Sequence, residues 1–345
     1  MAPTLSLDAP DFGPVAGWAP PDLKGRRIFL TGGTGFVGTW LLEYLRLHPE
    51  APPDLFVLSR DPGAFAERNP HLAALPWLTL VPGDVRELAA LPPGIDTVLH
   101  GATTASRILN DESPLEMTDV IVKGTERMLD LASRQGVRRF LFLSSGLACG
   151  TQPPELAAMP EDRTGDLDAL DPRAAYGNAK HFAEHLCIQH ARTAGFEACI
   201  ARLFAFVGPL LPLDAHFAAG NFLRDGLAGM PIRVQGDGTP LRTYLHAAEL
   251  AHWLWMLMDR GKAGEAYNVG SDEIVSIREL AEAVAHLCGV PVTIAGAPHP
   301  GRLPARYVPD IRKAGELGLR PILKLEESLR LTLAWHRRRM ERKSA

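Results

Sequence analysis

The sequence predicts an α/β protein with a doubly wound parallel sheet and a smaller, mixed carboxyl-terminal lobe. Short apolar strands alternate with helical segments up to about residue 205, the pattern of a parallel sheet covered by helices on both faces. The run 140–143 is apolar throughout, as expected of a strand buried on both sides. A glycine-rich turn from Gly32 to Gly38 joins the first strand to the first helix, where Rossmann-type folds bind phosphate groups. We therefore expect a Rossmann-type domain.

The order of elements follows from hydrophobic periodicity and from glycine and proline breaks. Strands are expected at 27–31, 55–58, 78–81, 97–100, 139–143 and 197–203, and helices at 39–47, 115–135 and 176–193. The pattern then loosens, with helices expected at 247–258, 277–287 and 325–342. We divide the chain into an irregular arm (1–24) with Phe12 and Trp18 as apolar anchors, an NAD(P)-binding domain (25–205) and a substrate lobe (206–345), with an interleaved border.

Composition and charge narrow the choice of partners. The 345 residues carry a formal net charge of −4, so no global basic field indicates nucleic acid or an anionic membrane. No apolar run is long enough to span a bilayer, and no basic segment followed by an apolar run marks a signal peptide. The four cysteines are scattered, and no metal-ligand spacing is present. We expect a reduced, cytoplasmic protein without a metal.

The glycine turn suits a dinucleotide. Gly32 permits the tight turn, Gly35 lets a pyrophosphate approach the backbone, and Gly38 lets helix and strand pack closely. Phe36 and Val37, in the turn just before the expected helix, join the expected cofactor contacts, and the free N–H groups and positive dipole end of that helix favour phosphates. The alternative is a purely structural strand-to-helix turn.

The end of the second strand indicates which dinucleotide is bound. An acidic residue there would bind the ribose 2′-hydroxyl of NAD. The sequence instead has Ser59 and Arg60, which suit a 2′-phosphate and favour NADP, although Asp61 could bind an NAD ribose. After the third strand, Asp84 could accept a hydrogen bond from the adenine amino group, or it could cap a turn.

A candidate catalytic set follows in the right order along the chain. Tyr176 and Lys180 are four residues apart on a predicted helix and share a face. A nearby ammonium group lowers the pKa of a phenol, which could then take a proton from a sugar hydroxyl while hydride leaves. Ser145 follows the apolar strand, at the carboxyl end where ligands bind, and could hydrogen-bond the reacting oxygen. The alternatives are a strand-end cap and an exposed amphipathic helix.

These motifs together resemble the extended short-chain dehydrogenase/reductase superfamily, in its nucleotide-sugar (NAD-dependent) epimerase/dehydratase branch. The resemblance extends over 27–335 and rests on the segments 31–38, 83–85, 122–125, 143–146, 176–180, 202–209 and 236–242. It implies that Ser145, Tyr176 and Lys180 are catalytic, with Tyr176 as the acid/base. It also implies that a nucleotide-diphosphate sugar binds between the lobes.

Further expectations come from the same resemblance. Arg242, and with it Arg306, would contact the diphosphate of the substrate, and Lys180 would also bind the nicotinamide ribose. Val85 and Ala102 join the expected cofactor contacts. A homodimer would form through the helices at 115–135 and 176–193.

The departures from the family pattern bear on the reaction. The 4,6-dehydratases have an Asp-Glu pair directly after the catalytic hydroxyl, and the decarboxylases a Glu, whereas this chain has Gly146 and Leu147. The usual Tyr before Gly150 is Cys149, for which a buried inert thiol is the simpler interpretation. A family Asn that contacts the substrate is Ala205, so that contact is either absent or supplied elsewhere. Asn221 and His216 are candidates to supply it, and the alternative for both is ordinary packing and capping in the lobe.

Four functions remain open. The first is epimerisation at C4 of the sugar with a recycled cofactor, and the second is reduction of a 4-keto sugar by NADPH. The third is reduction of a small, non-nucleotide aldehyde or ketone, against which Arg242 and the large second lobe argue. The fourth is a regulator that binds NAD(P) without catalysis, against which the intact Ser145, Tyr176 and Lys180 argue.

Overall fold

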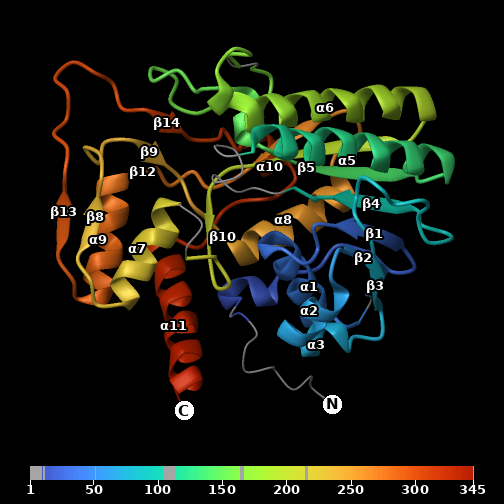
Figure 1. Cartoon of the computed structure of the whole chain (residues 1–345), viewed down its shortest axis with the longest axis horizontal. Coiled ribbons are helices and arrows are strands. Elements are labelled where there is room, and N and C mark those ends of the chain that lie inside the picture. The colour runs from blue at the N-terminus through green and yellow to red at the C-terminus, as the bar shows by residue number, and fades with distance from the viewer. Residues whose placement is uncertain are drawn as a thin grey trace.

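A computed structural model describes residues 10, 12–50, 52–103, 113–163, 167–213 and 217–344 of the chain (Figure 1). Its centre is a sheet of seven parallel strands in the order β11-β6-β5-β4-β1-β2-β3. These are β1 (Arg27–Thr31), β2 (Asp54–Ser59), β3 (Leu78–Pro82), β4 (Thr97–His100), β5 (Arg139–Ser145), β6 (Glu197–Leu203) and β11 (Ala266–Val269). The strand order reverses between β1 and β4, where doubly wound sheets bind their ligands. The predicted Rossmann-type fold class is confirmed.

Helices cover both faces of this sheet. Figure 1 shows α5 (Pro114–Arg134) and α6 (Ala175–Ala194) side by side on one face, with α1 (Phe36–Leu47) and α8 (Ala247–Arg260) on the other. Side chains alternate along a strand, so β1 serves both layers. Phe29 packs in the cluster that contains the α5 and α6 side chains, whereas Ile28 and Leu30 pack in the cluster that contains those of α1 and α8.

Helix α1 begins at Phe36, whereas the glycine pattern led us to expect residue 39. The expected start is wrong because Gly38 does not belong to the turn. It lies in the first turn of the helix, where its missing side chain lets the helix press against the backbone of Gly33. Gly35 is the N-cap, and Thr39 closes the first turn by donating its backbone N–H and its hydroxyl to the Gly35 carbonyl, each at 2.8 Å.

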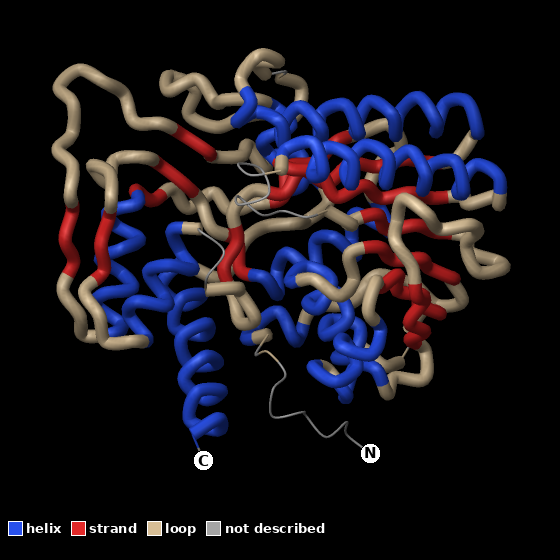
Figure 2. Tube along the Cα trace, in the orientation of Figure 1, coloured by secondary structure: helices blue, strands red, loops and turns tan. Residues whose placement is uncertain are grey.

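A second cluster of elements lies beyond the carboxyl ends of the strands. Figure 2 shows helices and short strands gathered there, apart from the main sheet. Leu223, Val284 and Leu329 belong to their shared core. Outside the main sheet and the four helices above, the elements are α2 (Pro62–Arg68), α3 (Pro70–Ala73), α7 (Ala218–Leu227), α9 (Ile277–Cys288), α10 (Arg312–Glu316), α11 (Leu325–Ser344), β7 (Phe206–Val207), β8 (Ile232–Val234), β9 (Leu241–Arg242), β10 (Leu245–His246), β12 (Val275–Ser276), β13 (Val292–Ile294) and β14 (Arg306–Tyr307), with 3-10 turns at Gly13–Gly17, Gly146–Cys149 and Pro172–Ala174.

The chain passes between the two parts more than once. After β7 it forms α7 and β8, and it then returns to the main body, where α8 packs on α1 and β11 pairs with β6. It leaves again for α9 and for the small sheet β12-β9-β14. This sheet brings β9 and β14 together in parallel, with Tyr307 opposite Arg242.

The described part of the amino-terminal arm packs on the domain. The ring of Phe12 lies 4.8 Å from that of Trp40 in α1, and the ring of Trp18 lies 4.5 Å from that of His252 in α8, measured between centroids. Phe12 is 3% exposed, so it belongs to the core. Both predicted anchors thus attach the arm to the helices that cover one face of the sheet. Among the described residues no helix is both long and apolar enough to cross a membrane.

Candidate active site

The three glycines of the first turn have different reasons to be glycine. Gly32 has a φ of +76°, and a Cβ there would lie 2.6 Å from the backbone of Gly101. A Cβ on Gly38 would lie 2.3 Å from the backbone of Gly33. Gly35 has a φ of −86°, and its Cβ would meet only the Gly32 carbonyl oxygen, at 3.5 Å. The fold therefore requires Gly32 and Gly38, whereas Gly35 leaves open space that fits a pyrophosphate close to the backbone.

Phe36 and Val37 follow this space as the first two residues of α1. Their backbone N–H groups lie at the positive end of the helix dipole, which suits the phosphates of a dinucleotide. The ring of Phe36 stacks on Phe206, with 5.3 Å between centroids and 7° between planes. The cofactor contact expected of Phe36 therefore falls to its backbone, while its side chain joins the two parts of the molecule.

A buried hydrogen-bond chain, which the sequence analysis did not find, holds the loop opposite the glycine turn. The backbone N–H groups of Gly101 and Ala102 donate to Oγ1 of Thr31, at 3.2 and 3.0 Å. The same oxygen lies 2.7 Å from Nδ1 of His100, whose Nε2 lies 3.1 Å from the Thr125 hydroxyl. Burial lowers the pKa of His100 to about 3, so the ring is neutral. This series of hydrogen bonds fixes the backbone of Ala102, one of the expected cofactor contacts.

Arg60 lies exposed directly after β2, while its two neighbours are engaged with the backbone. The buried Ser59 hydroxyl accepts the N–H of Asp61 at 3.2 Å. The Asp61 carboxylate caps α2 by accepting the N–H of Ala64 at 2.8 Å. The acid that could have bound an NAD ribose is thus used as a helix cap, and the Arg60 guanidinium is left at the strand end.

Asp84 is held by its own turn. Its carboxylate accepts the backbone N–H and the Nε–H of Arg86, each at 2.9 Å, and the Nη2–H at 3.1 Å. The Arg86 hydrogen bonds hold the pKa of this carboxyl below its usual range, and the positive charge of Arg60 acts in the same direction. Of the two roles left open, the turn cap is present. Val85 is buried, and a Cβ on Gly124 of α5 would lie 2.9 Å from it.

Ser145 and Tyr176 meet at the carboxyl end of β5. Ser145 is the last residue of that strand, and its hydroxyl accepts the N–H of Leu147 at 3.2 Å. Tyr176 lies in the first turn of α6. Burial raises the pKa of the Tyr176 phenol to about 12, and side-chain hydrogen bonding with Ser145 opposes that rise. The two hydroxyls are therefore in contact at the point where a Rossmann-type fold binds its substrate.

Lys180 is buried under the same strand. Its Nζ donates to the carbonyl oxygen of Leu143 at 2.7 Å and lies 4.7 Å from the centroid of the Phe142 ring. Burial lowers the pKa of the ammonium to about 8, and the carboxylate of Glu184 acts against this. The spacing between Tyr176 and Lys180 led us to expect that the ammonium lowers the pKa of the phenol. In the structure the group that lowers it is the hydroxyl of Ser145.

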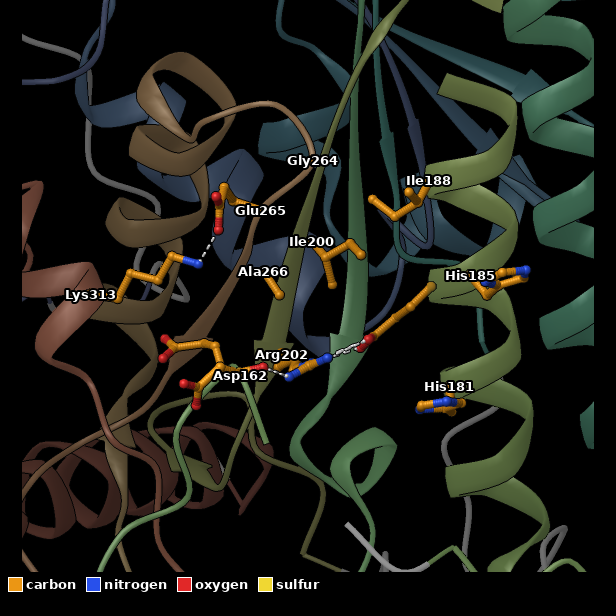
Figure 3. Close-up of a pocket in the computed structure, with 12 residues that line it drawn as sticks. Asp162, His181, His185, Ile188, Ile200, Arg202, Gly264, Glu265, Ala266 and Lys313 are labelled. Carbon is orange, nitrogen blue, oxygen red and sulfur yellow. Dashed lines mark hydrogen bonds and ion pairs between the residues drawn. The ribbon is translucent and has the colours of Figure 1, made fainter. Parts of the chain in front are cut away.

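Glu184 is a second residue that the sequence analysis passed over. Its carboxylate accepts the hydroxyl of Ser144 at 2.5 Å and forms a two-point ion pair with Arg202 of β6. Both residues of this pair line a cavity of about 360 Å³, in which Figure 3 labels Arg202. The ion pair attaches α6 to β6, and the Ser144 hydrogen bond attaches it to the end of β5, one helical turn after Lys180. The four-residue spacing between Lys180 and Glu184 is the sequence signal that could have pointed to Glu184.

Arg242 and Arg306 lie on adjacent strands of the small sheet. Arg242 extends over the ring of Tyr307, with 5.9 Å from its Cζ to the ring centroid, and burial lowers its pKa. Arg306 donates from Nε to the Pro154 carbonyl at 2.9 Å. Asn221 lies on α7 and lines a different cavity of about 390 Å³, while His216 lies outside the described residues.

The loop after Ser145 is closed to an added side chain. A Cβ on Gly146 would lie 2.6 Å from the ring of Phe204. Leu147 is 45% exposed and apolar, so residues 146 and 147 bring no carboxylate to Ser145. Cys149 is buried, and burial raises the pKa of its thiol to about 11, which makes the thiol inert at neutral pH.

The fold and the site define a class of protein: a Rossmann-type dinucleotide enzyme with a serine, a tyrosine and a lysine at the end of its central strands. The profile of the NAD dependent epimerase/dehydratase family matches residues 28–270, and the chain belongs to this family, within the extended short-chain dehydrogenases that its motifs predicted.

Curated proteins and solved structures agree. UDP-glucuronic acid decarboxylase 1 of Arabidopsis thaliana is 32% identical over 307 residues, covering 89% of this chain and 68% of that protein. The dTDP-glucose 4,6-dehydratase of Streptomyces venezuelae, solved with NAD bound, is 26% identical with a TM-score of 0.76, covering 90% and 97% of the two chains. The UDP-glucose 4-epimerase of Thermotoga maritima has the same fold, with a TM-score of 0.75 and 22% identity over 91% of this chain and 99% of that one.

Proposed function

We propose that this enzyme catalyses hydride transfer at C4 of a sugar carried by a nucleoside diphosphate, without elimination or decarboxylation. The observation that supports the proposal is the combination of the Ser145, Tyr176 and Lys180 set with a loop that offers no acid beside it. The relatives named above are, by their names, a decarboxylase, a 4-epimerase and a 4,6-dehydratase of nucleotide sugars. The family resemblance implies acids after the catalytic hydroxyl of dehydratases and decarboxylases, and this chain has none at residues 146 and 147.

The chain's own residues suffice for the proton chemistry. In oxidation, the Tyr176 phenolate takes the proton of the C4 hydroxyl, and the Ser145 hydroxyl donates a hydrogen bond to the same oxygen as negative charge develops. Lys180 supplies a positive charge beneath them from its anchor on Leu143. When bound, the nicotinamide cofactor accepts the hydride from C4 and can return it. The open space at Gly35 and the backbone N–H groups of Phe36 and Val37 would hold its pyrophosphate.

Elimination needs more than this set. A 4,6-dehydratase must remove a proton from C5 and protonate the leaving hydroxyl at C6, and the family does so with an Asp-Glu pair after the catalytic hydroxyl. Here the first of these positions is Gly146, pressed against Phe204, and the second is Leu147. Introduction of an acid at residue 146 would require the Phe204 ring to move. The missing acids support C4 chemistry alone.

Arg242 supports a nucleotide-linked substrate. It is a half-buried guanidinium on β9, and burial lowers its pKa. A buried positive charge is stabilised when a diphosphate binds to it, as the family resemblance implies. A reductase of small aldehydes has no use for such a group. Free UDP, CDP, GDP or TDP should therefore bind to the protein.

A second candidate, reduction of a 4-keto nucleotide sugar by NADPH, is favoured by one observation. Arg60 lies exposed after β2, the neighbouring Asp61 caps α2, and Asp84, whose pKa the charge of Arg60 lowers, is paired with Arg86. An exposed guanidinium at the end of the second strand suits the 2′-phosphate of NADP. An epimerase would keep its NAD bound, whereas a reductase would exchange NADPH.

The test is an assay of purified protein with a panel of UDP-, CDP-, GDP- and TDP-hexoses, with products identified by NMR. Interconversion of a pair of C4 epimers without net consumption of cofactor supports the epimerase. Stoichiometric loss of NADPH with a 4-keto substrate supports the reductase. Accumulation of a 4-keto-6-deoxy sugar, or release of CO2 from a nucleotide-linked uronic acid, would contradict the proposal.

We also propose that the enzyme is a homodimer. The support is the apolar side chains that α5 and α6 leave in solvent, where Leu115 is 84% and Phe182 is 49% exposed. Sedimentation as a species of twice the 37.5 kDa chain mass is the expected result.

A further inference from the structure

Tyr307 places a second phenol at the catalytic serine. Its ring packs on Phe204, with 4.6 Å between centroids, and its hydroxyl donates to the carbonyl oxygen of Leu203 at 3.3 Å. Leu203 is the residue of β6 that pairs with Ser145 in the sheet register. The register therefore brings the Tyr307 hydroxyl to the end of β5, from a strand of the carboxyl-terminal lobe.

Three hydroxyl groups thus meet, and Ser145 stands between two tyrosines. Side-chain hydrogen bonding with Ser145 acts on the pKa of Tyr176 and on that of Tyr307. Burial raises the pKa of Tyr307 above that of Tyr176, so Tyr307 is the phenol that keeps its proton when Tyr176 loses its own. Tyr176 can act as the base, and Tyr307 can act only as a hydrogen-bond partner.

The direction of these hydrogen bonds can be worked out from donors and acceptors. The single hydroxyl hydrogen of Tyr307 goes to the Leu203 carbonyl, which has none to return. The Tyr307 oxygen is therefore an acceptor for Ser145. The Ser145 hydroxyl has one hydrogen and already accepts from Leu147 N–H. It can give that hydrogen to Tyr307, to Tyr176 or to a substrate oxygen, but to one of them at a time.

We propose that Tyr307 is a positioning residue that holds the Ser145 hydrogen away from Tyr176 until substrate is bound. In the resting site Tyr176 donates to Ser145, and Ser145 donates to Tyr307. Once Tyr176 has lost its proton and substrate is bound, the Ser145 hydrogen moves from Tyr307 to the substrate oxygen. Tyr307 therefore favours the neutral form of Tyr176 and prevents Ser145 from settling on the phenolate.

The same tyrosine connects the chemistry to the substrate lobe. Tyr307 lies opposite Arg242 in the β9–β14 register, and the guanidinium of Arg242 extends over its ring. If Arg242 binds the diphosphate, as the proposed function on which this inference rests requires, the group that recognises the nucleotide also fixes the ring that holds Ser145. Binding of the diphosphate at Arg242 in one lobe would then affect the position of the Ser145 hydroxyl in the other.

The variant Tyr307→Phe tests this, because it removes one oxygen and keeps the ring between Phe204 and Arg242. We expect kcat to fall about tenfold, because Ser145 then donates to Tyr176 instead of the substrate. We expect the acid limb of the kcat profile, in the direction of sugar oxidation, to move down by about one pH unit. KM for the nucleotide sugar should change less than about twofold, because the cation–π contact with Arg242 remains.

Two comparisons make the test specific. Tyr267→Phe removes the hydroxyl of another buried tyrosine, which lies in β11 and accepts the N–H of Lys262, and should leave the pH profile in place. In a Ser145→Ala background, measured on residual turnover, Tyr307→Phe should have no further effect on the limb. An unmoved limb with kcat within twofold of wild type, or an equal effect in both backgrounds, overturns the role of Tyr307. A wild-type enzyme inactive on every nucleotide sugar instead overturns the proposed function.

Discussion

At the scale of the residue, the chemistry depends on Tyr176. Its pKa is raised by burial to about 12, so at neutral pH the phenolate is scarce, and oxidation should become faster as the pH rises. Tyr176→Phe removes the base while its ring still fills the site. We expect turnover to fall by about 10²–10⁴-fold and cofactor affinity to change little. Steady-state kinetics and a fluorescence titration with cofactor measure the two effects, and a variant that keeps over half of its turnover would remove Tyr176 from its assigned role.

Arg60 is the residue on which the choice of cofactor depends. Its guanidinium is exposed at the end of β2, so Arg60→Ala should not disturb the fold. We expect affinity for NADPH to fall about tenfold or more, since a charge-assisted contact is lost, and affinity for NADH to change far less. Arg68→Ala, at an exposed arginine near the end of α2, is the matched control. Equal losses for both cofactors would mean that Arg60 does not contact a 2′-phosphate.

Some site residues could be predicted from the sequence and others could not. The sequence alone identifies Ser145, because it follows an apolar strand. It also identifies Tyr176 and Lys180, because they are four residues apart in a predicted helix. The hydrogen bonds of Thr31 with His100 and Ala102, and of Tyr307 with the Leu203 carbonyl, join residues that are far apart in the sequence. Only the register of the strands shows that these groups meet. Polar side chains of this kind look like ordinary strand residues until their buried partners are known.

At the scale of the element, the first strand, turn and helix separate fold from function. Gly38→Ala would push a methyl group into the Gly33 backbone, and we expect a loss on the order of 3 kcal/mol in the free energy of unfolding. Gly35→Ala meets no such clash and should change stability by less than about 1 kcal/mol. It should nevertheless weaken cofactor binding, because the methyl group enters the space left for a pyrophosphate. Chemical denaturation and cofactor titration of both variants decide the matter, and a Gly35→Ala protein with wild-type affinity would refute the assignment.

Elements with a clear period were predicted closely, and turns were not. The strands at 27–31, 97–100 and 197–203 have the predicted bounds, because each is an apolar run with a sharp break at its ends. The start of α1 was missed because a glycine inside a helix looks like a turn residue. The small sheet β12-β9-β14 has strands of two residues each, too short for any periodicity. It is this sheet that brings Arg242 and Tyr307 together, so the link between the lobes could not be foreseen.

At the scale of the whole molecule, buried histidines make stability depend on pH. Burial lowers the pKa of His100 to about 3 and those of His252 and His336 to about 4. A histidine in the unfolded chain takes up its proton near pH 6.5, well before its folded counterpart. The unfolded state therefore binds more protons below that pH, and stability present above pH 6.5 is lost as the pH falls toward 4.

Glu161 and Glu249 have the opposite effect on stability over part of this range, because burial raises their pKa values and the folded state then binds more protons than the unfolded state.

A single-site comparison isolates the effect of one histidine on stability. His336 suits it because its Nε2 is buried and has no hydrogen-bond partner among the described residues, and its ring packs edge-on against Trp335. His336→Phe keeps an aromatic ring in that place and removes the titrating group. We expect the variant to lose about 2 kcal/mol less than wild type between pH 7.5 and pH 5. Urea unfolding at the two pH values measures the difference, and equal losses in both proteins would show that His336 is protonated in the folded state at pH 5.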